Sequence, residues 1–179
     1  WNPHGKMRPL HKFNPVRLGY IRDQAVAHFS RDPKKLDCLS GLRVLDIGCG
    51  TGYSSAILGR LAQTVVALES ELALAQEATR VLQTLGADNV AVIHGNLPAG
   101  YPAEGPFDAI VIEGAVAALP DALLGQLKDG GRLVAIVSDG RTGRAAVWQR
   151  SGNAVSERDG FDASAPFLPG FEPVRRFVF

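Results

Sequence analysis

The sequence predicts an α/β fold in which a mostly parallel sheet is doubly wound, with helices on both faces. Three observations support this prediction. Strand and helix patterns alternate from Leu42 onward, as they do in βαβ units. The run from Val44 to Gly52 reads as a buried strand that ends in a glycine-rich loop. A second apolar run, residues 65–68, ends in the acid Glu69. A chain of 179 residues has room for one domain with a substantial core.

The expected elements follow the changes in hydrophobic period along the chain. Strands are expected at 43–47, 64–69, 90–94, 107–112, 132–138, 144–150 and 173–179. Helices are expected at 53–61, 72–85 and 120–127. A turn at 129–131 leads into the fifth strand, and a long glycine- and proline-containing connection precedes the last strand.

The N-terminal part reads as an irregular basic arm over 1–14. Asn14 followed by Pro15 is typical of an N-cap and a first helical position, so a helix is expected over about 15–29. We therefore divide the single domain 1–179 into an arm and helix (1–41), a core (42–139) and a C-terminal strand pair (140–179).

Three glycines follow the first expected strand at alternate positions and precede a helix-forming stretch. Gly48 and Gly50 let the backbone turn sharply and leave room for a ligand against it, while Gly52 opens the helix. The carboxyl end of such a strand is where Rossmann-like folds bind adenosine-containing ligands. A dinucleotide site has a further glycine where this chain has Tyr53, which disfavours NAD or FAD.

Glu69 closes the second expected strand, about twenty residues after the first. A carboxylate there can accept hydrogen bonds from both hydroxyls of an adenosine ribose. With Asp46 inside the first motif, the pair of motifs resembles the S-adenosyl-L-methionine (SAM) site of class I methyltransferases. The resemblance implies a Rossmann-like seven-stranded sheet with an antiparallel C-terminal strand. It also implies SAM, or S-adenosyl-L-homocysteine (SAH) as the product, as the cofactor.

The composition argues against several other classes of protein. The formal net charge is +1, so no global field points to nucleic acid or acidic lipid as a partner. No apolar stretch reaches the length of a transmembrane segment, and no signal peptide is visible. Cys38 and Cys49 match no metal-ligand spacing, so we expect no metal site and a reduced, cytoplasmic setting. Cys49 is expected to serve packing.

The first fifty or so residues resemble the ubiquinone-biosynthesis O-methyltransferases. The resemblance is carried by Asn2-Pro3-His4-Gly5-Lys6, Arg8-Pro9-Leu10-His11-Lys12 and Asn14-Pro15-Val16-Arg17-Leu18. In that family the arginine of the Asn-Pro-x-Arg motif contacts SAM, and Arg17 is its counterpart here. A cation at that place would pair with the methionine carboxylate of the cofactor. The alternative is that Arg17 is a solvated residue on a surface helix.

From about Thr51 to the end, the chain resembles bacterial protein-L-isoaspartate O-methyltransferases. The matching strings are Val65-Val66-Ala67-Leu68-Glu69, Phe107-Asp108-Ala109-Ile110, Glu113-Gly114-Ala115-Val116, the run 126–134, Leu168-Pro169-Gly170-Phe171 and the ending Phe177-Val178-Phe179. The two resemblances meet inside the glycine loop. The chain is therefore either one divergent methyltransferase or a recombined chimera.

Two further residues are candidates for cofactor contacts. Glu113 follows the fourth strand, where class I enzymes line the methionine end of the cofactor or the acceptor pocket; a solvated rim carboxylate is the alternative. Asn96 stands where many relatives have an acid that accepts from the adenine amino group, which an amide oxygen can also do. His94 reads as a strand-end residue rather than a base, and Phe107 and Trp148 as core.

The acceptor determinants of both families are incomplete, so no catalytic residue is assigned. The Ser/Thr segment of isoaspartyl methyltransferases has no counterpart, and residues 117–120 replace the Glu-His-Val-Pro string of the quinone enzymes. Three hypotheses remain. The first is carboxyl O-methylation of isoaspartyl residues in a protein or peptide. The alternatives are O-methylation of a polyprenyl catechol as a ubiquinone precursor, and a SAM-binding scaffold without turnover.

Overall fold

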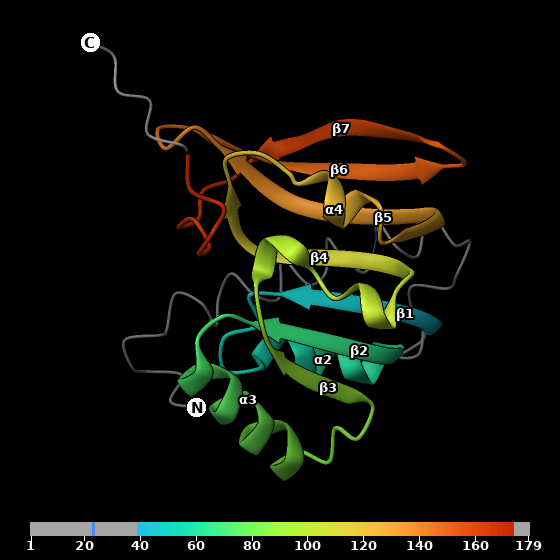
Figure 1. The fold of residues 1–179 in the computed structure, drawn as a ribbon, viewed down its shortest axis with the longest axis vertical. Helices are drawn as coiled ribbons and strands as arrows, with labels where there is room; N and C mark the ends of the chain where they lie inside the picture. The colour runs from blue at the N-terminus through green and yellow to red at the C-terminus, as the bar shows by residue number, and fades with distance from the viewer. Residues whose placement is uncertain (1–22, 24–38, 174–179) are drawn as a thin grey trace.

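The computed structural model describes Asp23 and residues 39–173 of the chain. Its strands form one seven-stranded sheet, which Figure 1 shows from β3 at the lower edge to β7 at the upper edge. The strands are β1 (Leu39–Ile47), β2 (Ala62–Glu69), β3 (Val90–His94), β4 (Phe107–Val116), β5 (Leu127–Ser138), β6 (Gly143–Ser151) and β7 (Ala154–Asp162). The helices are α2 (Tyr53–Leu61), α3 (Leu72–Thr84) and α4 (Asp121–Leu124), with 3-10 turns η1 (Leu97–Ala99) and η2 (Pro102–Glu104).

The sheet order is β3-β2-β1-β4-β5-β6-β7. Strands β1 to β5 are parallel, while β6 and β7 are antiparallel to their neighbours. The chain moves outward from β1 to β3 and then returns to β4 on the other side of β1. The gap between β1 and β4 is therefore the switch point of the topology, and ligands of open α/β sheets bind at the carboxyl ends of the strands at such a point. The predicted fold class is confirmed.

The two faces of the sheet carry different cores, because side chains of a strand alternate between faces. On one face, Val44 of β1 packs in a cluster with Leu58 of α2. On the other face, Leu45 shares a larger cluster with Leu97 of η1 and Leu123 of α4. The sheet is thus doubly wound, as predicted. Phe107 and Trp148 are buried in the larger cluster, which confirms that they are core residues.

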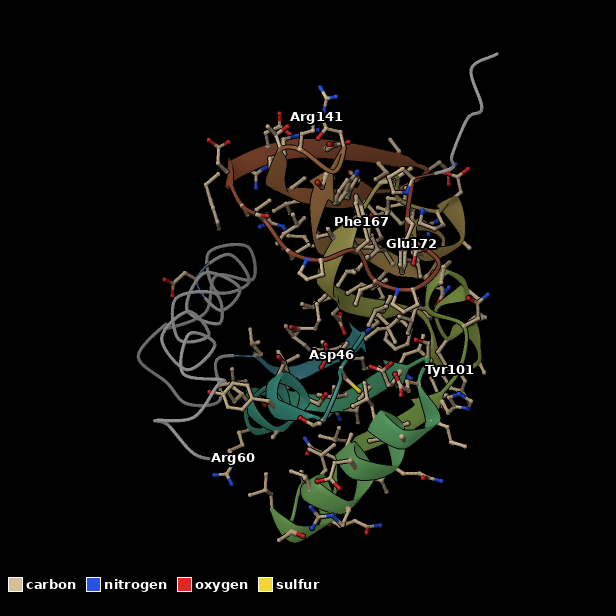
Figure 2. All side chains as sticks on the ribbon, turned by 90° about the vertical axis from the view of Figure 1, so that its left-hand side faces the viewer. Asp46, Arg60, Tyr101, Arg141, Phe167 and Glu172 are labelled. Atoms are coloured by element: carbon tan, nitrogen blue, oxygen red, sulfur yellow. The ribbon has the colours of Figure 1, made fainter. Side chains whose placement is uncertain are left out.

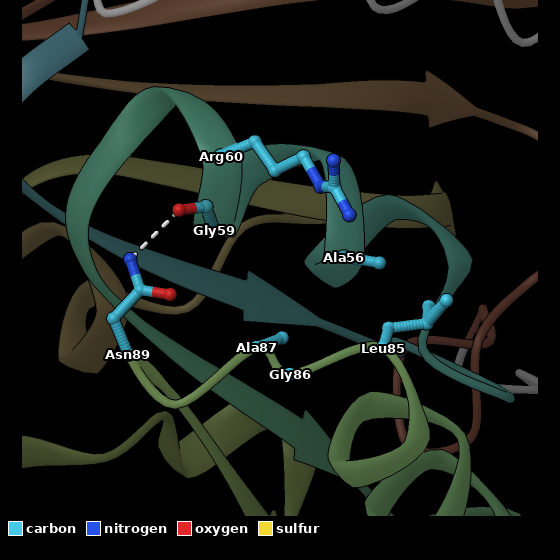
Figure 3. A pocket seen from close by; sticks show the side chains of 7 residues that line it. All are labelled: Ala56, Gly59, Arg60, Leu85, Gly86, Ala87 and Asn89. Carbon is cyan, nitrogen blue, oxygen red and sulfur yellow. Dashed lines mark hydrogen bonds between the residues drawn. The ribbon is translucent and has the colours of Figure 1, made fainter.

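Helix α2 is fixed at both of its ends. Its N-cap, Gly52, has a φ of +83°, and a Cβ there would lie 3.2 Å from Leu82 Cδ1 of α3. At the other end, Asn89 Nδ2 donates to Gly59 O at 2.7 Å, the contact drawn in Figure 3, and to two carbonyls just beyond the helix. The pocket in Figure 3 lies at this end of α2 and includes residues that precede β3, so it lies near the amino end of this strand, whereas the glycine loop follows the carboxyl end of β1. The residue just before β3 therefore anchors the end of α2.

Several element bounds differ from the sequence prediction. Strand β4 continues to Val116 instead of ending at 112, because Ala115 and Val116 still pair with β5 after a register shift. Ala115 N also donates to Pro166 O at 2.8 Å. Strand β5 already begins at Leu127 and absorbs the expected turn at 129–131 as a register shift in its pairing with β4. Helix α4 has only four residues in place of the expected 120–127.

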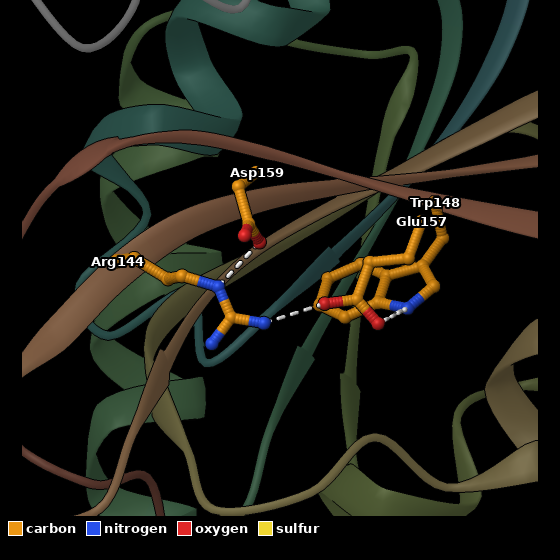
Figure 4. Close-up of polar contacts among 4 residues, drawn as sticks. All are labelled: Arg144, Trp148, Glu157 and Asp159. Carbon is orange, nitrogen blue, oxygen red and sulfur yellow. Dashed lines mark hydrogen bonds and ion pairs between the residues drawn. The ribbon is translucent and has the colours of Figure 1, made fainter.

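The C-terminal part differs more. Part of the expected long connection forms β7, while residues 174–179 of the last expected strand and the expected helix over 15–29, apart from Asp23, lie outside the described residues. A polar ladder joins β7 to β6, as Figure 4 shows. Arg144 of β6 pairs with Asp159, and its Nη2 also donates to Glu157 Oε1 at 2.9 Å. Trp148 Nε1 donates to the other oxygen of Glu157 at 3.1 Å.

Within the described part of the chain, no helix has the length and apolar character needed to cross a bilayer.

Candidate functional site

The glycine loop after β1 folds back over the end of β2. Gly48 N donates to Leu68 O at 2.8 Å, and Cys49 N donates to the same oxygen at 3.3 Å. Gly52 N then donates to Cys49 O at 3.0 Å, which closes the loop just before α2. Gly48, Gly50 and Gly52 all have positive φ, at +78°, +56° and +83°, where residues with a Cβ are disfavoured. The backbone requirement inferred from the sequence is therefore present at all three positions.

Glu69, the last residue of β2, lies against this loop. The residue is only 5% exposed, and Oε2 accepts a hydrogen bond from Gly50 N at 2.9 Å. The other oxygen, Oε1, accepts from Ser70 N at 2.7 Å and from Glu71 N at 3.0 Å. A carboxylate held by several backbone N–H groups has a fixed orientation. Glu69 thus connects the loop after β1 to the turn after β2.

Asp46 is buried under the glycine loop, where it contacts α2. Its side chain is fully buried, and Oδ2 accepts a hydrogen bond from Ser55 Oγ of α2 at 2.6 Å. This contact joins β1 to the first turn of the helix that begins after the loop. Ser55 was not among the sequence candidates, because a serine at the start of a helix gives no specific signal.

The three glycines of the loop differ in what surrounds them. A Cβ on Gly48 would lie 2.7 Å from Leu168 Cδ1, so the side chain of Leu168 already occupies that direction. A Cβ on Gly52 would meet α3. At Gly50, by contrast, a Cβ would find nothing within 4 Å. The sequence predicted room for a ligand beside both Gly48 and Gly50. Of these two residues, only Gly50 has no neighbouring atom where a Cβ would point.

Leu168 belongs to a C-terminal segment that crosses the carboxyl end of β4. Leu168 N donates to Ala115 O at 3.1 Å, and a Cβ on Gly114 would lie 2.7 Å from Leu168 Cγ. Leu168 therefore sits between Gly48, just after β1, and Gly114 of β4, at the switch point. In Figure 2 the part of this segment that carries Phe167 lies between the β5–β6 turn, marked by Arg141, and the loop end of β1, marked by Asp46. Nothing in the sequence singles out Leu168 apart from its place in the family string Leu168-Pro169-Gly170-Phe171.

Cys49 is buried in the loop in a small cluster with Ala67 and Ala78, as expected for a packing residue. Burial raises the pKa of its thiol well above the ordinary value, and the nearby carboxylates of Asp46 and Glu69 raise this pKa further. The thiol therefore stays protonated at neutral pH, which argues against a nucleophilic role.

The remaining predicted contacts take different places. Glu113 of β4 is partly buried and near enough to the loop to add to the rise in the Cys49 pKa. Asn96 is exposed just after β3, and the preceding Gly95 N donates to Glu69 O at 2.9 Å, which places Asn96 at the same edge of the sheet. His94 is the last residue of β3, as predicted. Arg17 lies outside the described residues.

The strand order, the glycine loop and the acid at the end of β2 together define the fold of a class I methyltransferase. The particular family follows from comparison with known sequences. The model of the protein-L-isoaspartate(D-aspartate) O-methyltransferase (PCMT) family matches residues 26–168, so the chain belongs to this family.

Solved structures agree with the fold. A protein-L-isoaspartate O-methyltransferase superimposes with a TM-score of 0.73 and 26% identity, over 86% of this chain and 47% of that one. A putative protein-L-isoaspartate O-methyltransferase from Plasmodium falciparum, solved in complex with SAH, has a TM-score of 0.60 and 23% identity, over 70% of this chain and 64% of that one.

Curated relatives match the N-terminal part of the chain and carry a different name. The ubiquinone biosynthesis O-methyltransferase of Chelativorans sp. (strain BNC1) is 57% identical over 70 residues, which are 39% of this chain and 28% of that protein. The enzyme of the same name from Rhizobium etli is 62% identical over 66 residues, or 37% and 27% of the two chains. The match thus spans less than a third of these relatives. Both resemblances inferred from the sequence are confirmed.

Proposed function

We propose that the chain is a SAM-dependent methyltransferase domain that methylates the free carboxylate of isoaspartyl residues in proteins or peptides. The observation that carries the proposal is the family match over residues 26–168, joined to a glycine loop with Glu69 bound to it. The likeness to a solved protein-L-isoaspartate O-methyltransferase over 86% of the chain supports the same reaction.

The residues present fit the adenosine part of SAM. The loop leaves space at Gly50, and Glu69 reaches this loop from the next strand. A carboxylate offers about four lone-pair positions. Three backbone N–H groups take three of them, two on Oε1 and one on Oε2, so Oε2 keeps one position for a ribose hydroxyl. Asp46 acts from below the loop, by holding α2 through Ser55.

Three further contacts belong to the proposal. Asn96 would accept from the adenine amino group, and Glu113 would lie near the methionine end of the cofactor. Arg17 would pair with the methionine carboxylate.

Methyl transfer from SAM requires little of the protein beyond aligning the acceptor oxygen with the methyl group. SAM supplies an electrophilic methyl group on a sulfonium. An oxygen of the isoaspartyl carboxylate forms a bond to the methyl carbon as the bond to sulfur breaks, which leaves a methyl ester and SAH. Because the acceptor is already ionised, no residue needs to remove a proton, and positioning supplies much of the rate.

Calorimetric titration with SAH tests the cofactor part. The wild-type chain should bind, and Glu69→Ala should lose most of the affinity because the ribose acceptor is gone. Glu71→Ala is the matched control: it removes the neighbouring exposed carboxylate but keeps the backbone N–H that supports Glu69. Equal affinity in wild type and Glu69→Ala would remove Glu69 from the site.

A radiolabelled methyl-transfer assay tests the acceptor. Isoaspartyl peptide should be labelled and the same peptide with ordinary aspartate should not. A catechol quinone precursor belongs in the same assay, because the identity of 57% and 62% to ubiquinone biosynthesis O-methyltransferases favours it as the second candidate. Labelling of the catechol alone would support that alternative. SAH binding without transfer to either acceptor would indicate a scaffold.

A further inference from the structure

A side chain of β3, that of His94, contacts the turn after β2. His94 is not among the predicted cofactor contacts. His94 is the last residue of β3 and lies opposite Glu69 in the parallel pairing of β2 and β3. Its Nε2 lies 3.0 Å from Ser70 O. Because a carbonyl oxygen only accepts, this contact places a proton on Nε2, and His94 is the donor.

The carbonyl that His94 contacts shares a peptide unit with the N–H of Glu71. That N–H donates to Glu69 Oε1 at 3.0 Å. A peptide unit is rigid and planar, so its C=O and its N–H turn together. A donor on Ser70 O therefore fixes the direction in which the Glu71 N–H points toward the Glu69 carboxylate.

We infer that His94 is a positioning residue of the proposed SAM site, acting through the Ser70–Glu71 peptide on Glu69. The chain of contacts runs from His94 to this peptide, then to Glu69 Oε1, and from Glu69 Oε2 to Gly50 N at 2.9 Å. It links β3, the turn after β2 and the glycine loop through one carboxylate. The inference rests on the proposed function, since it assigns a role to His94 toward the same ligand.

Two substitutions of His94 distinguish the loss of its hydrogen-bond donor from a change in the shape of its side chain. His94→Phe keeps a ring and removes the donor, whereas His94→Gln offers an amide N–H at a similar reach. We expect His94→Phe to raise the Kd for SAH about fivefold to tenfold, as the loss of one hydrogen bond would. His94→Gln should stay within about twofold of wild type. Thr84→Ala is the control, because it also removes a side-chain donor to a backbone carbonyl, on α3 and away from the site.

A second measurement does not depend on the ligand. Hydrogen exchange at the Glu71 amide should be faster in His94→Phe than in wild type and should return to the wild-type rate in His94→Gln. The melting temperature of each variant reports any general loss of stability, which would not be rescued at this amide alone.

The outcomes separate this inference from the proposed function. Weaker SAH binding in His94→Phe that His94→Gln restores supports the positioning role. Unchanged binding in His94→Phe, or equal weakening in both variants, overturns it while the proposed function stands. Failure of the wild-type chain to bind SAH overturns the proposed function, and the positioning role with it.

Discussion

Substitution of Gly48 by alanine should destabilise the fold for two separable reasons. The backbone there has φ of +78°, and a left-handed conformation costs a residue with a Cβ about 1–2 kcal/mol. The new Cβ would also lie 2.7 Å from Leu168 Cδ1, which forces one of them to move. Overpacking of this kind costs about 1–3 kcal/mol. We therefore expect Gly48→Ala to lower the free energy of unfolding by about 2–5 kcal/mol.

Only the steric part depends on Leu168. Leu168→Ala alone should cost about 1–2 kcal/mol, because the side chain is half-buried. In the double variant the collision at position 48 is gone while the backbone strain remains. The double variant should thus be more stable than the sum of the two single changes predicts, by about 1–3 kcal/mol.

Urea unfolding followed by circular dichroism measures all four members of this cycle. Gly50→Ala provides the matched control, since its φ is also positive, at +56°, but nothing lies within 4 Å of its Cβ position. It should show backbone strain alone and add to Leu168→Ala within about 0.5 kcal/mol. Additivity of Gly48→Ala with Leu168→Ala would refute the reasoning, because it would mean that Leu168 does not constrain position 48.

Four further predictions concern Gln126, Asn89 and Cys49. Gln126→Leu should lower the free energy of unfolding, measured by urea unfolding, by about 2–4 kcal/mol, because the buried amide of Gln126 bonds three backbone groups. Gln83 is exposed, so Gln83→Leu is the control and should change this free energy little. Asn89→Ala should lower the melting temperature, with a loss of about 1–3 kcal/mol, because it removes the donor to three carbonyls at the end of α2. In a Cys38→Ser background, iodoacetamide should label Cys49 far more slowly in the folded than in the unfolded chain, because the pKa of the folded thiol is raised. The same raised pKa predicts that stability falls as pH rises above about 8.5, the value for an unfolded thiol, and a flat profile there would contradict it.

The parts of the fold that the sequence predicted well are those set by local pattern. Strands β1 to β3 are apolar runs bounded by polar, glycine or proline residues. Their pairing and the position of Glu69 at the end of β2 could therefore be predicted from the spacing of these runs along the chain. Strand β7 was missed because all nine of its residues are exposed, so no buried face imposes an alternation on the sequence. Its Gly160 read as part of a loop for the same reason.

The parts of the site that were missed depend on contacts between distant residues. Nothing in the local sequence of Leu168 indicates that its side chain fills the space beside Gly48, more than a hundred residues earlier. His94 was interpreted as a strand-end residue, which is correct, but its contact with Ser70 O depends on the register of β3 against β2. Sequence patterns predict which elements exist, whereas these contacts are set by the way the elements pair.

The exposed outer strand of the sheet has a consequence for contacts between copies of the chain. An unpaired edge strand is a template for another strand, and proteins often protect such edges with charge. The acidic pair on β7 flanks Arg158. If two β7 strands met antiparallel about Arg158, this arginine would face itself and Glu157 would face Asp159. Centring the pair on either acid would bring that acid opposite its own copy. Among the described residues β7 is the outermost strand of the sheet. In each of these alignments like charges would lie opposite each other, which disfavours self-association through this strand.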